Sequence, residues 1–340
     1  MLGLPPLPRT LAAALRDVSS KKAEVRADAL RDLVRHADDA RAQVVRAIEG
    51  ALRDDDPRVR ALAATALSDV DAKEALAALL VTVEDDDAYV RQMAISALGE
   101  LGDVRAGERL RRALKDARPE VRFQAVMAFP RVTARKDDAL DAVLEAMADD
   151  DPLVVHVAVR MAEELSGEER PDDRVLARAR KLLSHEAAAV KVAAAVLLAH
   201  AGDAAGHDLL VKAATGALRD VDGEDEAAAI ELCGELGLAS AREGLGRRAF
   251  GGFLGLGRDR FQWHARVALA RMGDERAIKE ILAELRSWDR QRRTLAVAAA
   301  GRARLSAARE EIAGMLGNPD KADPDAVDEA LRALDRKPAK

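Results

Sequence analysis

The fold of this chain is decided by "DDPRVRALAATALSDV" (residues 55–70), a stretch repeated as "DDAYVRQMAISALGEL" (86–101) and "ARPEVRFQAVMAFPRV" (117–132). Each copy opens with acidic residues or a proline and continues with the pair Val-Arg. Apolar residues then lie three, four, seven and eight positions after Val59 and after Val90. That spacing is one face of an α-helix.

The valine of this pattern recurs along the chain, and we call it the anchor. Anchors occur at Val25, Val59, Val90, Val121, Val154 and Val190, and weaker copies place Asp225, Phe261, Arg292 and Val327 in the same position. A second helical segment lies between consecutive anchors, as in residues 72–84 and 275–287. One helix pair cannot bury its apolar face alone, but stacked pairs bury a continuous strip. The sequence therefore predicts an all-α fold, an α-solenoid of about ten helix pairs.

The repeated stretches resemble HEAT repeats of the short bacterial kind related to phycobilin lyases. The resemblance covers the chain from about residue 8 onward. It implies a solenoid whose second helices line the concave face, and arginines after the anchors that bond to aspartates of the turns. The matching residues are Arg26, Arg60, Arg91 and Arg122, with Lys191 as a near match. The pattern lapses at Val155, Glu226 and Gln262, so we expect those repeats to stack differently.

Residues 1–340 are interpreted as a single solenoid domain with two irregular segments. "SGEERPDD" (166–173) is the expected position of a bend, and an extended glycine-rich aromatic loop is expected at 250–260. Pro130 is expected to end or kink its helix, because proline lacks the N–H that a helix interior needs.

Composition narrows the functional class. A formal net charge of −6 argues against nucleic acid as the partner of the whole surface. The single cysteine, Cys233, excludes an internal disulfide and a zinc site built from several thiolates. The N-terminus does not resemble a signal peptide, and no apolar stretch is long enough to span a membrane. We therefore expect a soluble cytoplasmic protein.

Catalytic and metal-binding patterns are weak throughout. His185-Glu186 is the only His-Glu pair, whereas di-iron enzymes built from HEAT repeats carry several. His200 and His207 have no third ligand at a suitable spacing. The glycines of 251–257 match neither a phosphate-binding loop nor a dinucleotide turn. We predict no enzyme activity, no metal and no cofactor.

Aromatic residues are rare and concentrated in one region. The chain has five Phe, two Trp and one Tyr, and five of these eight lie in 250–288, where basic residues are also in excess. Aromatic and arginine side chains are enriched in interaction hot spots. The candidate partner-binding residues are Phe123, His156, Phe250, Phe253, Arg258, Arg260, Trp263, Trp288 and Arg290. The alternative interpretation is that Phe261 and Trp288 belong to the core and that the charges are a solvated face.

Trp263 lies two positions after its anchor, and the same column elsewhere is small, apolar or uncharged. The column reads Ala27, Ala61, Gln92, Phe123, His156, Val192, Ala227, Trp263 and Thr294. It predicts a groove with little charge that accepts an extended peptide or an amphipathic helix, unless neighbouring helices cover it.

The first hypothesis for function is a non-catalytic scaffold that binds a protein or peptide on its concave face, with the 250–293 region as an anchoring surface. The second is nucleic-acid binding of the kind seen in HEAT-like DNA glycosylases, which use a basic face. Bilin lyase activity is a third and weaker alternative, because it rests on repeat similarity alone. The sequence does not identify the partner, the pathway or the oligomeric state.

Overall fold

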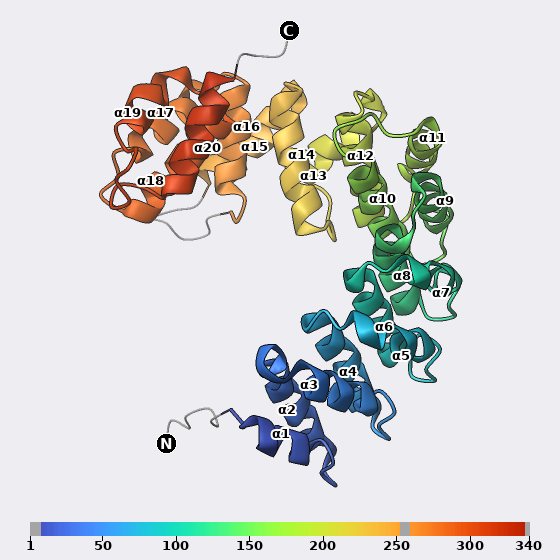
Figure 1. The fold of residues 1–340 in the computed structure, drawn as a ribbon. Helices are drawn as coiled ribbons and strands as arrows, with labels where there is room; N and C mark the ends of the chain where they lie inside the picture. The colour runs from blue at the N-terminus through green and yellow to red at the C-terminus, as the bar shows by residue number, and fades with distance from the viewer. Residues whose placement is uncertain (1–7, 252–258, 337–340) are drawn as a thin grey trace. The chain divides into compact units, whose positions relative to one another are not determined.

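The computed structural model describes residues 8–251 and 259–336, and within them it contains twenty α-helices and no β-strand (Figure 1). The chain divides into two compact units, residues 1–170 and 171–340. Each unit holds five helix pairs, so the predicted fold class and the predicted number of about ten pairs are confirmed. The boundary between the units lies within residues 166–173, and the single-domain interpretation stays a prediction.

The second helix of each pair carries the anchor, and we call these the anchor helices. In the first unit they are α2 (Ala23–Val34), α4 (Pro57–Asp69), α6 (Ala88–Leu101), α8 (Pro119–Val132) and α10 (Pro152–Ser166). In the second unit they are α12 (Ala188–His200), α14 (Gly223–Glu235), α16 (Gln262–Arg271), α18 (Arg290–Arg302) and α20 (Pro324–Asp335). Consecutive anchor helices within a unit pack against each other, as α4, α6 and α8 do in Figure 1.

The first helix of each pair packs mainly on its own anchor helix. These first helices are α1 (Leu11–Asp17), α3 (Ala37–Ala51), α5 (Leu76–Thr82), α7 (Gly107–Ala113) and α9 (Lys136–Ala146) in the first unit. In the second unit they are α11 (Asp173–Leu182), α13 (His207–Ala214), α15 (Arg242–Phe250), α17 (Glu275–Glu284) and α19 (Arg309–Ala313). Five of them are preceded by a short 3₁₀ turn: Lys73–Ala75, Val104–Ala106, Ala204–Gly206, Ala239–Ala241 and Ser306–Ala308.

Helix ends follow the capping signals of the sequence. Asp56 caps α4 through the N–H of Arg58, and Pro57 takes the first helical position, where its missing N–H costs nothing. Gly102 ends α6 with a φ of 64°, a left-handed conformation that glycine adopts without strain. Pro130 does not act as such a signal, because α8 continues through it to Val132. Pro130 therefore does not end its helix, and the alternative expectation, a kink, stays a prediction.

Small side chains bring the anchor helices close together. A Cβ atom added to Gly99 of α6 would lie 2.7 Å from the Cβ of Ala128 on α8. In the second unit a Cβ on Gly234 of α14 would lie 2.5 Å from the Cα of Ala268 on α16. Each unit has its own apolar core along this contact, and Cys233 is fully buried in the core of the second.

Candidate functional site

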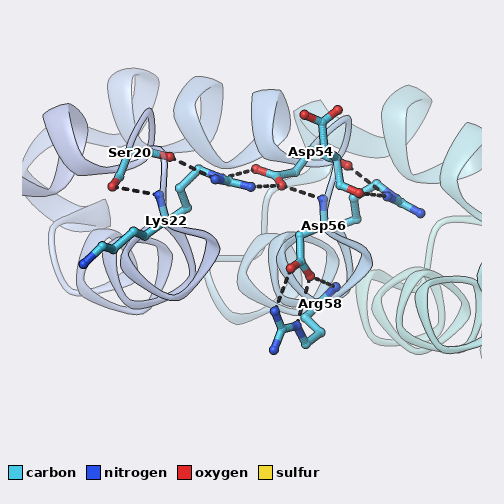
Figure 2. A network of polar contacts seen from close by, with 8 residues as sticks. Ser20, Lys22, Asp54, Asp56 and Arg58 are labelled. Atoms are coloured by element: carbon cyan, nitrogen blue, oxygen red, sulfur yellow. Dashed lines mark hydrogen bonds and ion pairs between the residues drawn. The ribbon is translucent and has the colours of Figure 1, made fainter.

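A ladder of arginine–aspartate bonds ties consecutive repeats together in the first unit. Arg26 of α2 donates to both carboxylate oxygens of Asp54, over 2.6 and 2.5 Å, and to the carbonyl of Ser20 (Figure 2). Asp54 in turn accepts the N–H of Asp56 over 2.9 Å. One carboxylate therefore closes the turn before α4 and holds the arginine of the preceding repeat.

The same bonds recur at three further turns. The bidentate pairs are Arg60–Asp85, Arg91–Asp116 and Arg122–Asp149, with donor–acceptor distances from 2.6 to 2.9 Å. Each of these arginines also donates to the carbonyl six residues before it. The four arginines implied by the resemblance are thus confirmed as turn-binding residues. Lys191, the near match, forms no such pair among the described residues, and the turn before its helix uses His185 as the acceptor instead.

The ladder carboxylates stay ionised to lower pH than free aspartate. Burial alone raises their pKa, but the arginine hydrogen bonds and the backbone N–H bonds outweigh it. The net effect is a lowered pKa for Asp54, Asp85, Asp116 and Asp149. Arg58 and its own N–H lower the pKa of the capping Asp56 to about 2. These shifts mark structural ion pairs, since every carboxylate faces a turn.

In the second unit one link of the ladder has its charges exchanged. Glu226 takes the position after the anchor, where the first unit has arginine, and Arg248 of α15 bonds to it over 2.7 Å. Arg248 also bonds to Asp259 over 2.9 Å, and Asp259 accepts the N–H of Phe261 as Asp54 accepts that of Asp56. Arg260 adds a second pair to Glu226. The described residues on either side of 252–258 are therefore held together by Arg248.

The aromatic and basic side chains of residues 250–293, which we call the aromatic-basic region, include both buried and exposed ones. Phe261 is buried, with the guanidinium of Arg260 4.5 Å from its ring centre. Phe250 and Trp263 are half-buried and pack on the core, each beside an arginine. Phe253 and Arg258 lie outside the described residues. The extended loop expected at 250–260 likewise falls mostly outside them.

Trp288 is the exception to this packing. It is 92% exposed, more than any other large apolar residue that the structure describes. Arg290, two positions on, is also exposed and bonds to the carbonyl of Pro319. The interpretation that placed Trp288 in the core is therefore wrong, because this residue lies at the middle of a turn and its side chain meets no neighbouring helix.

The uncharged column predicted to form a groove is not continuous. Ala61 and Val192 are fully buried, because the neighbouring anchor helix packs over them. Phe123 and His156 are half-buried on the exposed side of α8 and α10. The column is thus partly covered, as the alternative interpretation allowed.

A groove does exist beside this column: Ala27 of the column lines it, and on the next two anchor helices Leu62 and Met93 line it one position after the column residues. It has a volume of about 540 Å³ and crosses α2, α4 and α6, so we call it the α2–α6 groove. Its apolar lining includes Ala27, Leu62, Met93 and Tyr89. Leu62 and Met93 stand three positions after Val59 and Val90, on the apolar helix face that the spacing predicts, but both are only half-buried and line this groove. Tyr89 was missed, although its apolar character just before an anchor was a usable signal.

A smaller pocket lies on the next helices of the same unit. It has a volume of about 290 Å³, and we call it the 92–153 pocket. Its lining is Gln92, Pro119, Glu120, Phe123, Asp151 and Leu153. Phe123, a predicted partner-binding residue, therefore lines a pocket of the first unit.

Burial also affects the cysteine and one histidine of the second unit. Burial raises the pKa of the Cys233 thiol to about 12, which leaves it protonated. Burial also lowers the pKa of His264, and this effect outweighs the carboxylate of Glu231, 3.8 Å away, which raises it. Among residues 8–251 and 259–336, no three His, Cys, Asp or Glu side chains are grouped so as to hold a metal ion. In the same residues, no helix is long and apolar enough to cross a membrane.

Comparison with known proteins identifies the repeat. Residues 79–163 match the family model of HEAT repeats, which confirms the resemblance seen in the sequence. No curated protein matches the chain. Among solved structures, the chain is similar to YibA of E. coli, with 16% identity, a TM-score of 0.55 and coverage of 78% of this chain and 93% of that one.

Two further structures are similar. Importin beta matches with 13% identity and a TM-score of 0.52 over 94% of this chain and 50% of that one. The CpcE–CpcF complex of phycocyanin lyase from Nostoc matches with 19% identity over 72% and 94%, but its TM-score of 0.43 is too low to support a conclusion. At these identities the likeness shows the fold alone.

Proposed function

We propose that this chain of HEAT repeats is a non-catalytic scaffold that binds a helical segment of another protein in the α2–α6 groove. The observation that carries the proposal is the apolar lining of that groove, in which Ala27, Leu62 and Met93 pack on the core and remain partly exposed. Leu62 and Met93 lie on neighbouring helices and are half-buried without a partner helix over them. An apolar surface of this kind marks an interaction site.

The groove suits an amphipathic helix. Neighbouring helix axes lie about 10 Å apart, so a groove across three helices spans about 20 Å, the length of about thirteen helical residues. Its rim carries both signs of charge, with Glu24 and Asp28 near Arg31 and Arg58. We therefore expect a partner helix with one apolar face and mixed charges at its edges.

The absence of catalysis is part of the proposal and rests on the groove's chemistry. Its lining contains no histidine or cysteine, and its charged residues are Glu24, Asp28, Arg31 and Arg58. A cytoplasmic location stays a prediction from the sequence.

Nucleic-acid binding has less support. Several arginines in and beside the aromatic-basic region are bonded to carboxylates, as in Arg248–Glu226, Arg266–Glu280 and Arg271–Glu235. A guanidinium held in this way releases fewer counterions on meeting a phosphate. No observation on the described residues favours bilin chemistry.

Photocrosslinking tests the scaffold proposal. A benzophenone amino acid is placed at Thr65 in the groove, and in a matched variant at Gln43 on the exposed side of α3. In lysate of the source cells we expect the Thr65 chain, and not the Gln43 chain, to crosslink one discrete protein.

The adduct should disappear in Leu62→Glu and in Tyr89→Glu, the second of which changes an exposed side chain and spares the core. Val104→Glu, at an exposed apolar residue outside the groove, is the control and should keep it. Equal crosslinking at both positions, or an adduct that survives both groove variants, would contradict the proposal.

A further inference from the structure

Trp288 occupies a turn position that several other repeats fill with a charged residue. It is the middle residue between the turn acceptor Ser287 and the helix cap Asp289. Asp55 and Asp86 stand at the equivalent place in the first unit, and both are exposed. A tryptophan side chain buries 150–250 Å² when it finds a site. This side chain is 92% exposed, so nearly all of that area is available to a partner.

The surroundings of Trp288 are basic. Arg286 and Arg290 flank it in sequence and are exposed. Arg286 pairs only with Glu311 on the surface, and Arg290 bonds to a backbone carbonyl, so neither charge is buried. A partner for this turn therefore needs an apolar cavity with an acidic rim.

The 92–153 pocket of the first unit has these properties. Pro119, Phe123 and Leu153 give it an apolar lining, and Glu120 and Asp151 stand at its edge. Its volume of about 290 Å³ lies at the lower end of ligand pockets, which suits a single large side chain. Leu153 is 67% exposed, so the pocket is open to the outside.

The two units also differ in formal net charge. Residues 1–170 carry 26 Lys and Arg against 33 Asp and Glu, a formal charge of −7. Residues 171–340 carry 28 against 27, a formal charge of +1. The first unit is thus acidic and the second nearly neutral, so the arginines of the Trp288 turn have their opposite charges mainly in the first unit, and local complementarity of this kind guides association.

We propose that a second copy of this chain inserts Trp288 into the 92–153 pocket, with Arg286 and Arg290 facing Glu120 and Asp151. The donor turn and the acceptor pocket are different surfaces, so the contact is head-to-tail and leaves one of each free. It extends into a ring or an open filament rather than closing as a symmetric dimer. This self-association is separate from the α2–α6 groove and stands without it.

Sedimentation velocity of the full chain tests the proposal. From about 1 to about 200 µM, where a micromolar contact forms, the average mass of the natural chain should rise with concentration. Trp288→Ala should weaken association at least tenfold. Leu236→Ala removes another exposed apolar side chain of the same unit and should leave association unchanged. Raising salt from about 0.05 to about 0.5 M should weaken it, because the contact pairs opposite charges.

Complementation separates donor from acceptor. Leu153→Glu blocks the pocket at an exposed residue and should abolish association without touching the core. Mixed with the Trp288→Ala chain, it should form a one-to-one dimer that grows no further, because one functional donor meets one functional pocket.

Three outcomes overturn the proposal. The first is a natural chain that stays monomeric over the whole concentration range. The second is a Trp288→Ala chain that associates as strongly as the natural chain, and the third is a failure of the two blocked chains to pair.

Fluorescence of a Trp263→Phe chain tests whether the contact forms within one molecule. The Trp288 emission should shift to shorter wavelength only as concentration rises, and a shift already complete at about 1 µM would contradict the second copy.

Discussion

Arg91 offers the sharpest test of the ladder, because all its bonds run to the neighbouring turns. It donates to both oxygens of Asp116 at 2.9 Å, and to the carbonyls of Asp85 and Asp86 at 2.9 and 3.2 Å. The side chains of Arg91 and Asp116 are 15% and 16% exposed, so water reaches the pair only at its edge. Replacing Arg91 with methionine keeps the stem and removes every donor.

The cost follows from what is left behind. Removing one partner of a fully buried ion pair costs about 3–5 kcal/mol, because the other charge stays desolvated. Here Asp116 keeps the N–H bond from Arg118 and some water, so we expect roughly 2–3 kcal/mol. For a unit of this size that lowers the melting temperature by roughly 5–10 °C. The control is Arg112→Met, which breaks an exposed pair with Glu108 and should cost less than about 0.5 kcal/mol.

Amide hydrogen exchange is the right assay, because the two units need not unfold together. Peptides from α6 and α8 should lose protection by roughly 30- to 150-fold in Arg91→Met, with little change beyond residue 171. In an Asp116→Asn background the same substitution should cost less, since the stranded charge is gone. If Arg91→Met behaves like Arg112→Met, the ladder does not hold the repeats together and the reasoning fails.

Three further predictions concern packing, pH and the thiol. Gly99→Ala should destabilise the first unit by about 1–3 kcal/mol because its Cβ would meet Ala128, whereas Gly50→Ala, with nothing within 4 Å, should stabilise it by about 0.5–1 kcal/mol in urea unfolding. The ladder carboxyls have lowered pKa values when folded, so their stabilisation is complete above about pH 4 and is lost as pH falls through the folded values. Circular dichroism during acid titration should show the first unit unfolding below that pH, and at higher pH in Arg91→Met. Cys233 should resist a thiol reagent until the second unit unfolds, as labelling followed by mass spectrometry will show.

The periodic part of this fold could be predicted because it depends on local spacing. Anchors at regular intervals gave ten pairs, and Asp-Pro and Gly-Asp signals gave their ends. The link from Arg60 to Asp85 was implied by the resemblance, and the same geometry occurs at four turns of the first unit. These features need only neighbouring repeats to be alike.

What could not be predicted depends on contacts between unlike neighbours. The sequence shows Glu226 where arginine is expected, but only the structure shows that Arg248 replaces the missing cation from another helix. The column through Ala61 was predicted to be open, and the packing of the adjacent helix buries it. Leu62 was predicted to be buried, and the lack of a helix over it leaves a groove. Ala61 and Leu62 are consecutive residues, so a shift of one position around the helix separates a buried side chain from a partly exposed one.

A substitution at the turn position of Trp288 should change binding without changing the stability of the fold. The side chains of Asp55 and Asp86 form no hydrogen bond or ion pair within the described residues, whereas the residues on either side of each close the turn. At Asp55 and Asp86 the middle position therefore adds no side-chain bond to the fold, whereas Asp150 and Arg260 at the same position pair with Arg122 and Glu226. Trp288, at 92% exposure, is like the first two. Trp288→Asp should leave the unfolding free energy within about 0.5 kcal/mol, as for other surface changes. Any loss of association in that variant then belongs to the surface alone, and an equal loss of stability would show that Trp288 packs on its own chain.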